Sequence, residues 1–398
     1  MASTCRMCPD VCSSSAKSAK RPPGAHTPRA ESVYCRPPPR TAPLRRRKVD
    51  PFVPVMLDEI HEQPDAFARA ISLESRSAAA IAEDAKRRGV GLVMLAARGS
   101  SDNAAIFGKY LIQIQNSLPV CLASPSVFTC YGARMDLSRA LVVGISQSGE
   151  APDVTQVLLR ASEMGALTVA ITNTEGSPLA SAADHVLLCR AGQERSVAAT
   201  KTFMNSLAAI YLLSAALGGH DSSLAGDLRT LPDWMRAVLS LSDAIASKVD
   251  RYRYLQECVV ISRGLNLTTA LEAALKLTET CYLVAEPYSA SDFQHGPIAM
   301  VDEGFCCILF APDGVCLPDM RQMVHRLKER RAEVVAFSAD DEVLAAATIG
   351  FRMPPGIPEI LSPPLYVLAG QLFACHLSVA RGLDPDSPRG LRKVTRTW

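Results

Sequence analysis

The sequence lacks an apolar run long enough to cross a membrane. Its longest predicted apolar helix covers residues 207–217, whereas a transmembrane helix needs about 20 apolar residues. No secretion signal is recognised, so the 13 cysteines, which mostly lie in apolar runs, are interpreted as buried thiols in a reducing compartment. We therefore expect a cytoplasmic protein with no membrane partner.

Three familiar binding motifs are also missing. There is no Walker loop, no Gly-x-Gly-x-x-Gly and no helix-turn-helix segment. The net charge is +2, but residues 1–50 carry eleven Lys/Arg and three Asp/Glu, a net of +8, which leaves −6 for the remainder. A mildly acidic body gives no indication of nucleic-acid binding.

The first 55 residues form a basic segment rich in Pro and Ser, for which we predict disorder because it has almost no apolar periodicity. It contains Cys5, Cys8 and Cys12, but only His26 is near as a fourth ligand, so we expect no metal. Its composition faintly resembles a transit peptide, and a misassigned start codon before Met56 is an equal alternative.

What is present begins with the sequence Gly-Ile-Ser-Gln-Ser-Gly-Glu at residues 144–150, between a predicted buried strand and a helix. Free backbone N–H groups at a helix N-terminus favour an anion, and Ser146 and Ser148 add hydroxyl donors. A phosphate monoester fits this turn best. The alternative is an ordinary turn with a serine N-cap.

The chain alternates predicted helices and strands from residue 56 onward. Strands at 91–96, 141–145 and 167–172 alternate with helices at 104–115 and 153–164, which predicts a parallel, doubly wound α/β sheet. A second polar turn, at residues 98–103, also follows a strand, and ligands bind at such carboxyl ends.

An internal repeat divides the chain. The residues Cys-Val-Val-Ile-Ser-Arg-Gly at 258–264 echo those at 93–99, and similar echoes recur at an offset near 165 residues, which indicates two copies of one α/β domain. We predict a helical segment at 56–85, a first domain at 86–222, a helical connector at 223–250, a second domain at 251–383 and a tail at 384–398. The second copy has Ala-Pro-Asp-Gly at 311–314, so it has lost the phosphate turn.

The second copy carries a charged constellation. We predict a helix at 268–286, where Glu272, Lys276 and Glu279 share one face. On their own they suit a solvated salt-bridge stripe, but His295 follows in a Gly-Pro loop. A carboxylate, a lysine and a histidine are what proton transfer beside a carbonyl needs. Lys393 has no local mark of reactivity.

These motifs resemble the isomerase module of glutamine–fructose-6-phosphate aminotransferase, a pair of sugar isomerase (SIS) domains. The resemblance covers about Met56 to the C-terminus and rests on residues 145–150, 197–201, 270–279, 295–297 and 386–393. It implies that Ser101, Ser146, Gln147 and Ser148, with backbone at Val197 and Ala198, hold the sugar phosphate.

The same resemblance implies catalytic roles. Glu279 matches the base that moves a proton between C1 and C2, and His295 matches a ring-opening residue taken from a neighbouring subunit. Lys393 matches the lysine that forms a Schiff base, and Glu272 and Lys276 match supporting residues. A homodimer with a shared active site is therefore expected.

The sequence also departs from the family. Ala151 stands where the aminotransferase has Thr, and Arg98, Asp102 and Asn103 differ from its first turn. No cysteine directly follows Met1, and we expect no glutaminase activity. These features resemble the SIS-type glucosamine-6-phosphate deaminases.

We therefore expect conversion of glucosamine 6-phosphate to fructose 6-phosphate and ammonia, without metal or other cofactor. The alternatives are an aminotransferase-type enzyme without a glutaminase, a fructosamine-6-phosphate deglycase and a non-catalytic sugar-phosphate sensor.

Overall fold

The computed structural model describes residues 53–218 and 223–394. We predict disorder for residues 1–55, and residues 1–52 of this segment lie outside the described part. The Cys5–Cys12 motif lies there as well.

The first half contains a sheet with the strand order β2-β1-β3-β4-β5, in which every neighbouring pair is parallel. Its elements are α1 (Val55–His61), α2 (Gln63–Arg87), β1 (Leu92–Ala96), α3 (Ser100–Asn116), β2 (Val120–Leu122), α4 (Pro125–Thr129), β3 (Ala140–Ile145), α5 (Pro152–Glu163), β4 (Leu167–Thr172), α6 (Pro178–Ser181), β5 (His185–Leu188) and α7 (Lys201–Leu217).

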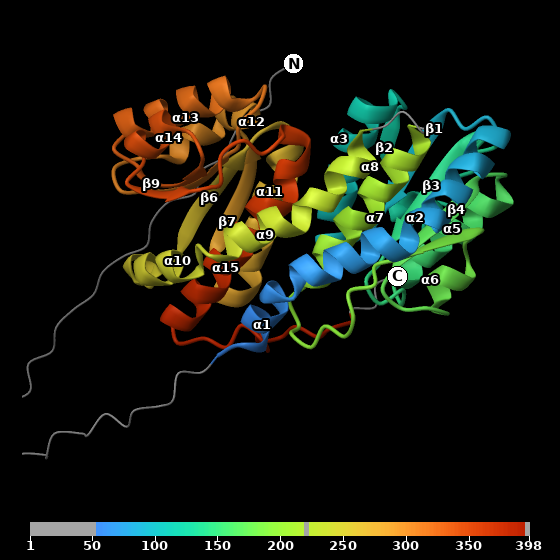
Figure 1. The fold of residues 1–398 in the computed structure, drawn as a ribbon, viewed down its shortest axis with the longest axis horizontal. Helices are drawn as coiled ribbons and strands as arrows, with labels where there is room; N and C mark the ends of the chain where they lie inside the picture. The colour runs from blue at the N-terminus through green and yellow to red at the C-terminus, as the bar shows by residue number, and fades with distance from the viewer. Residues whose placement is uncertain (1–52, 219–222, 395–398) are drawn as a thin grey trace, which may run out of the picture. The chain divides into compact units, whose positions relative to one another are not determined.

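The second half repeats this plan in a second parallel sheet with the order β10-β9-β8-β6-β7 (Figure 1). A connector precedes it: α8 (Leu224–Asp227), η1 (Leu228–Thr230), α9 (Leu231–Leu239), α10 (Ser242–Val249) and η2 (Asp250–Tyr252). Its own elements are β6 (Glu257–Ser262), η3 (Gly264–Asn266), α11 (Leu267–Cys281), β7 (Val284–Ser289), α12 (Ala290–Gln294), η4 (Pro297–Met300), β8 (Cys306–Ala311), α13 (Leu317–Glu329), β9 (Glu333–Ser338), α14 (Asp341–Ala346), β10 (Ile349–Arg352), η5 (Glu359–Leu361) and α15 (Ser362–Ala380).

Both sheets are covered on two faces, as the predicted doubly wound architecture requires. Strand β1 shows how, because Val93 and Leu95 belong to the core shared with α3 and α7, whereas Met94 and Ala96 belong to the core under α5. Strands buried on both faces read as continuous apolar runs, which is why such runs in the sequence located them.

The repeat is also visible in side-chain contacts. Arg98 follows β1 and its Nε donates to Asp153 in the first turn of α5 at 2.8 Å. In the second half, Arg263 follows β6 and its Nη1 lies 3.0 Å from Asp319 in the first turn of α13. The same strand-to-helix ion pair therefore occurs in both copies.

One predicted helix is wrong in extent. The helix predicted over 268–286 ends at Cys281, because Tyr282 adopts a left-handed conformation with φ of 57°, and the following residues pair with β6 as strand β7. The connector predicted at 223–250 is helical over almost that range, from Leu224 to Tyr252, but it is divided into the short helices α8, η1, α9, α10 and η2.

The longest apolar helix is not at 207–217 as predicted. Residues 359–380, which include α15, form a helix long and apolar enough to cross a membrane by length and composition, but 89% of its most apolar window is buried inside the protein. Its packing against α11 and α10 identifies it as a core helix.

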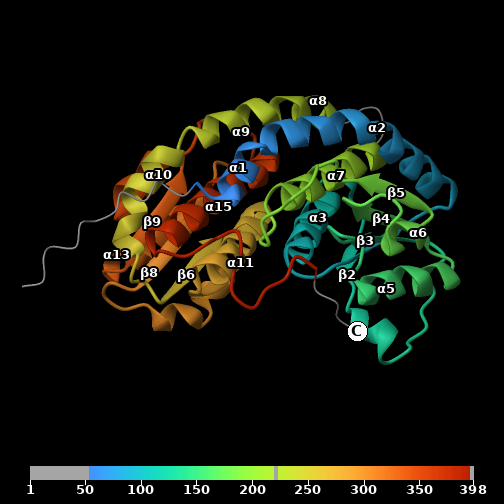
Figure 2. The ribbon, with the colours of Figure 1, turned by 90° about the horizontal axis from the view of Figure 1, so that it is seen from below.

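The two halves meet where the first sheet's carboxyl edge faces α11. Helix α3 packs against α11, and one continuous core contains side chains of α2, α7, α11 and α15. Figure 2 shows the chain after α15, in red, passing from the second half toward the first.

Candidate functional site

The predicted phosphate turn lies at the carboxyl end of β3. The Ser146 hydroxyl oxygen accepts from the backbone N–H of Gly149 at 3.2 Å, and that of Ser148 accepts from the N–H of Glu150 at 3.2 Å. Gly149 has a φ of 67°, and a Cβ there would lie 2.1 Å from Oγ of Ser177. Glycine is therefore required for this loop to close against the segment that precedes α6.

The second polar turn lies beside it, because β1 and β3 are neighbouring strands about 4.8 Å apart. The sequence predicts a turn at 98–103 before a helix at 104–115, but helix α3 already begins at Ser100. Ser100 and Ser101 therefore belong to the first turn of this helix. The hydroxyls at the carboxyl ends of β1 and β3 thus share one edge of the sheet.

The charged face of α11 is buried, so the stripe is not solvated. Glu272 and Lys276 are fully buried, while Glu279 is partly exposed. Leu271 and Leu275, on another face, are only partly buried. The helix therefore turns its charges inward.

The first domain supplies the partners of these charges. Ser100 Oγ donates to Oε1 of Glu272 at 3.0 Å, and Nδ2 of Asn103 donates to Oε2 at 2.8 Å. Nζ of Lys276 donates to Oγ of Ser100 at 3.3 Å. The sequence alone predicts no role for Ser100 or Asn103, because their partners lie about 170 residues away.

Lys276 lies between two carboxylates. Its Nζ is 3.4 Å from Oε1 of Glu272 and 2.5 Å from Oε2 of Glu279. Burial would lower the pKa of Lys276, but the two carboxylates outweigh burial and raise it, so Lys276 is an ammonium. Burial raises the pKa of Glu272, which Lys276, Asn103 and Ser100 partly offset.

The segment after α15 brings Lys393 to the first domain. The Asp386 carboxylate accepts from the backbone N–H groups of Val55 and Met56 at 2.8 and 2.7 Å. The backbone carbonyl oxygen of Asp386 accepts from the N–H of Val197 at 3.0 Å. Arg389 donates its N–H to the Tyr282 hydroxyl at 2.9 Å. The N–H of Val197, a predicted phosphate donor, is thus already engaged.

Lys393 is consequently not a free surface charge. Its Nζ donates to Oε2 of Glu194 at 2.5 Å and to the carbonyl oxygen of Ser196 at 2.8 Å. Ser196 directly precedes Val197 and Ala198. Glu194 is a buried carboxylate that no sequence motif marks, because its partner Lys393 lies 199 residues away.

His295 does not join this cluster within one chain. Glu279 lies in the last turn of α11, near the amino end of β7, whereas His295 follows α12 beyond the strand's carboxyl end. Six strand residues separate the two ends by roughly 17 Å. His295 is exposed, which leaves it accessible to a second molecule.

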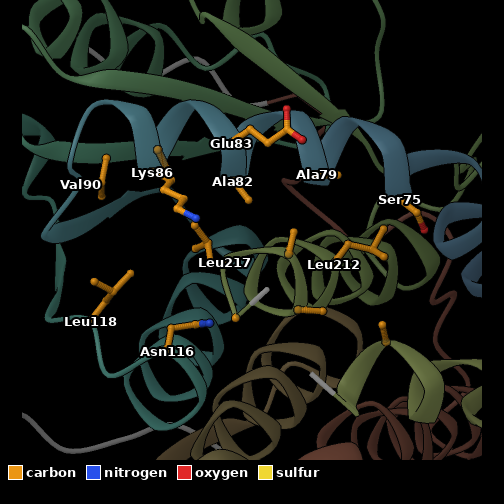
Figure 3. A pocket seen from close by; sticks show the side chains of 15 residues that line it. Ser75, Ala79, Ala82, Glu83, Lys86, Val90, Asn116, Leu118, Leu212 and Leu217 are labelled. Carbon is orange, nitrogen blue, oxygen red and sulfur yellow. The ribbon is translucent and has the colours of Figure 1, made fainter. Parts of the chain in front are cut away.

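A cavity of about 720 Å³ lies elsewhere (Figure 3). Alanine and leucine side chains of α2 and α7 dominate its lining, with Lys86 and Asn116 among the polar residues. It lies at the C-terminal end of α7, roughly 25 Å along that helix from Glu194, and contains none of the predicted site residues. In the described part of the chain, no group of three or more His, Cys, Asp or Glu side chains could hold a metal ion.

Comparisons with known proteins agree with this architecture. The SIS domain model matches residues 92–216 and 256–381. The glutamine–fructose-6-phosphate aminotransferase (isomerising) of Methanothermobacter thermautotrophicus is 36% identical over 340 residues, which is 85% of this chain and 56% of that protein. The chain therefore spans about half the length of the curated relatives it matches.

Solved structures show the same similarity. The C-terminal domain of glucosamine-fructose-6-phosphate aminotransferase from Francisella tularensis has a TM-score of 0.77 at 25% identity, covering 86% of this chain and 100% of that one. The glucosamine-6-phosphate deaminase from Thermotoga maritima has a TM-score of 0.69 at 20% identity, covering 86% and 99%, and supports the fold alone. With two matched domains over most of its length, the chain belongs to the SIS domain family.

Proposed function

We propose that this protein is a glucosamine-6-phosphate deaminase, which releases fructose 6-phosphate and ammonia. The observation that carries the proposal is the position of Lys393, whose Nζ lies 2.8 Å from the carbonyl oxygen of Ser196. Ser196, Val197 and Ala198 lie in the loop between β5 and α7. This loop begins near the Gln147 turn, because Asn173 donates its side-chain amide to the carbonyl oxygen of Gly192 at 2.8 Å and its backbone N–H to the carbonyl oxygen of Gln147 at 3.0 Å.

In this proposal the phosphate is held by the serine hydroxyls and by backbone N–H groups at the carboxyl edge of the first sheet. Helix N-termini and hydroxyl donors at such an edge bind anions well. With the phosphate at this edge, the sugar extends toward α11, whose buried face carries Glu272, Lys276 and Glu279.

The proton transfer is assigned to Glu279. After His295 of the partner subunit opens the ring, the Glu279 carboxylate takes the proton from C2 and returns it to C1, which converts the 2-amino aldose into a 2-imino ketose. Lys276 stays charged and orients Glu279. A positioned carboxylate accelerates such a step by about 10²–10⁴-fold.

Release of ammonia is assigned to Lys393. Its amine attacks C2 of the imine, ammonia leaves, and water then hydrolyses the lysine Schiff base to give fructose 6-phosphate. The overall reaction consumes one water and needs no redox partner. A homodimer follows from the use of His295 in trans.

We also propose a cytoplasmic location. Six of the nine cysteines in the described residues are buried, and all nine are free thiols. Buried free thiols in such number suit a reducing compartment.

The test is an assay of ammonia and fructose 6-phosphate released from glucosamine 6-phosphate. Borohydride added with fructose 6-phosphate should trap the sugar on Lys393. Glu279→Gln should keep this trapping yet lose exchange of the C1/C2 proton with solvent, whereas Lys393→Ala should lose trapping.

If the protein binds sugar phosphate but shows no adduct, no proton exchange and no ammonia release, it is a non-catalytic sensor and not an enzyme. A second candidate is the reverse amination, because the curated relatives are named aminotransferases. Net formation of glucosamine 6-phosphate from fructose 6-phosphate and ammonia at their physiological concentrations would favour it.

A further inference from the structure

Glu194 has a more elaborate set of contacts than a loop carboxylate needs. Its Oε1 accepts from the backbone N–H groups of Thr200 and Thr202 at 2.9 and 3.1 Å. Its Oε2 accepts from the Thr202 hydroxyl at 2.6 Å and from Nζ of Lys393 at 2.5 Å. The Glu194 side chain has no exposed surface, and each of its two oxygens accepts at least two hydrogen bonds, which hold the carboxylate in one position.

These contacts keep Glu194 ionised. Burial would raise the pKa of its carboxyl, but the Lys393 ammonium and the hydrogen bonds from Thr202 and Thr200 lower it below the usual value. The two backbone donors belong to the N-terminal end of α7, where the helix dipole also favours negative charge. Glu194 is therefore a buried carboxylate anion, and its Oε2 lies 2.5 Å from Nζ of Lys393, the nitrogen on which the proposed Schiff base forms.

We infer that Glu194 is the positioning residue and counter-ion of Lys393, holding its ammonium beside the sugar site and stabilising the protonated Schiff base that replaces it. The inference rests on the proposed function. Lys393 must first lose one proton, because only the neutral amine has a lone pair with which to attack the carbonyl carbon. As the C–N bond forms, the carbonyl oxygen receives this proton and a second one from the nitrogen and leaves as water. The iminium keeps the third proton, so the lysine nitrogen carries +1 both before and after the step. One fixed carboxylate can therefore serve both states without moving.

A neighbouring carboxylate supplies a matched control. Glu59 is also buried and also braces this loop, since it accepts from the N–H of Arg195 at 2.5 Å and from the Ser196 hydroxyl at 2.7 Å. Its cationic neighbour, however, is Lys201, whose Nζ lies 3.6 Å away. Glu59 lies in α1, so Glu59→Gln removes a buried charge that contacts this loop without removing the partner of Lys393.

The experiment compares full-length wild type, Glu194→Gln and Glu59→Gln. The rate of borohydride trapping with saturating fructose 6-phosphate is measured by mass spectrometry of the Lys393 peptide. Binding of glucitol 6-phosphate, which has no carbonyl group, is measured by calorimetry. A charge-assisted hydrogen bond contributes about 1.5–3 kcal/mol, so Glu194→Gln should slow trapping at least about tenfold while the Kd for glucitol 6-phosphate changes less than about threefold.

Glu59→Gln should trap at close to the wild-type rate once the sugar is saturating, and Glu194→Asp should recover part of the lost rate. Equal trapping by wild type and Glu194→Gln overturns the inference, as does an equal loss in Glu59→Gln. If Glu194→Gln does not fold, Glu194→Asn, which also removes the charge, replaces it, and trapping at the wild-type rate in that variant overturns the inference. If the wild-type protein itself never traps the sugar, the proposed function is wrong. Failure of the proposed function is thereby distinguished from failure of the inference about Glu194.

Discussion

Lys276→Met tests whether α11 holds a buried ion cluster whose charges depend on one another. The wild-type ammonium is fully buried and lies 3.4 Å from Glu272 and 2.5 Å from Glu279. Its removal leaves Glu272 as a buried carboxylate with only Ser100 and Asn103 as donors. Breaking one side of a buried pair costs about 3–5 kcal/mol.

This cost converts into a melting temperature. The entropy of unfolding is about 2.1 cal/mol/K per residue, so the roughly 340 described residues give about 0.7 kcal/mol/K. Lys276→Met should therefore melt about 4–7 °C below the wild type. Differential scanning calorimetry at pH 7 measures the shift directly.

Two variants control for the substitution itself. Thr278→Met places the same side chain on an exposed position of α11 and should change stability by less than about 0.5 kcal/mol. Lys276→Met combined with Glu272→Gln removes the stranded charge and should recover more than half of the loss. The reasoning is refuted if Lys276→Met melts within 1 °C of the wild type, or if the double variant is less stable than the single one.

Three further predictions follow from the site and from the surface. Ser146→Ala with Ser148→Ala should weaken the binding free energy of the sugar phosphate by a few kcal/mol, since each charge-assisted hydrogen bond contributes about 1.5–3 kcal/mol. The Michaelis constant should therefore rise, while kcat changes less. An unchanged Michaelis constant contradicts the phosphate assignment. Mixing inactive His295→Ala with inactive Glu279→Ala should restore some activity through hybrid dimers that contain one intact site, and no recovery after confirmed subunit exchange argues against the shared site. Arg251, with Tyr252, lowers the pKa of Glu333 against the effect of burial, so the ionised Glu333 stabilises the fold above the ordinary carboxyl pKa of about 4.3, and this contribution is lost as the pH falls through the lower folded value. The difference in stability between wild type and Glu333→Gln should therefore be present at pH 7 and shrink below about pH 4. A difference that persists at pH 2 in urea titrations is inconsistent with this cause.

Helix α11 shows where pattern reading succeeds and where it stops. The spacing of Glu272, Lys276 and Glu279 places them on one helical face, because the period of an α-helix is local. Spacing cannot say whether that face points to water or inward. The answer depends on Ser100 and Asn103 of the other domain, about 170 residues earlier in the chain.

The end of α11 illustrates a second limit. The helical pattern continues through residue 286, but the chain leaves the helix at Tyr282 to pair with β6. Backbone pairing with a neighbouring strand outweighs a weak local preference, since tertiary context routinely overrides propensity.

The sequence by itself determined the alternation of buried strands and helices, the duplication and the two polar turns at strand ends, because each of these is written in residues close together along the chain. Tertiary structure alone decided that the charges of α11 are buried, that Lys393 pairs with Glu194, and that Glu279 and His295 lie at opposite ends of β7. The first two are relations between residues distant in the chain, and they arise only when the two sheets share one core and the C-terminal segment crosses between them. The third arises because residues 284–289 pair with β6 instead of extending α11.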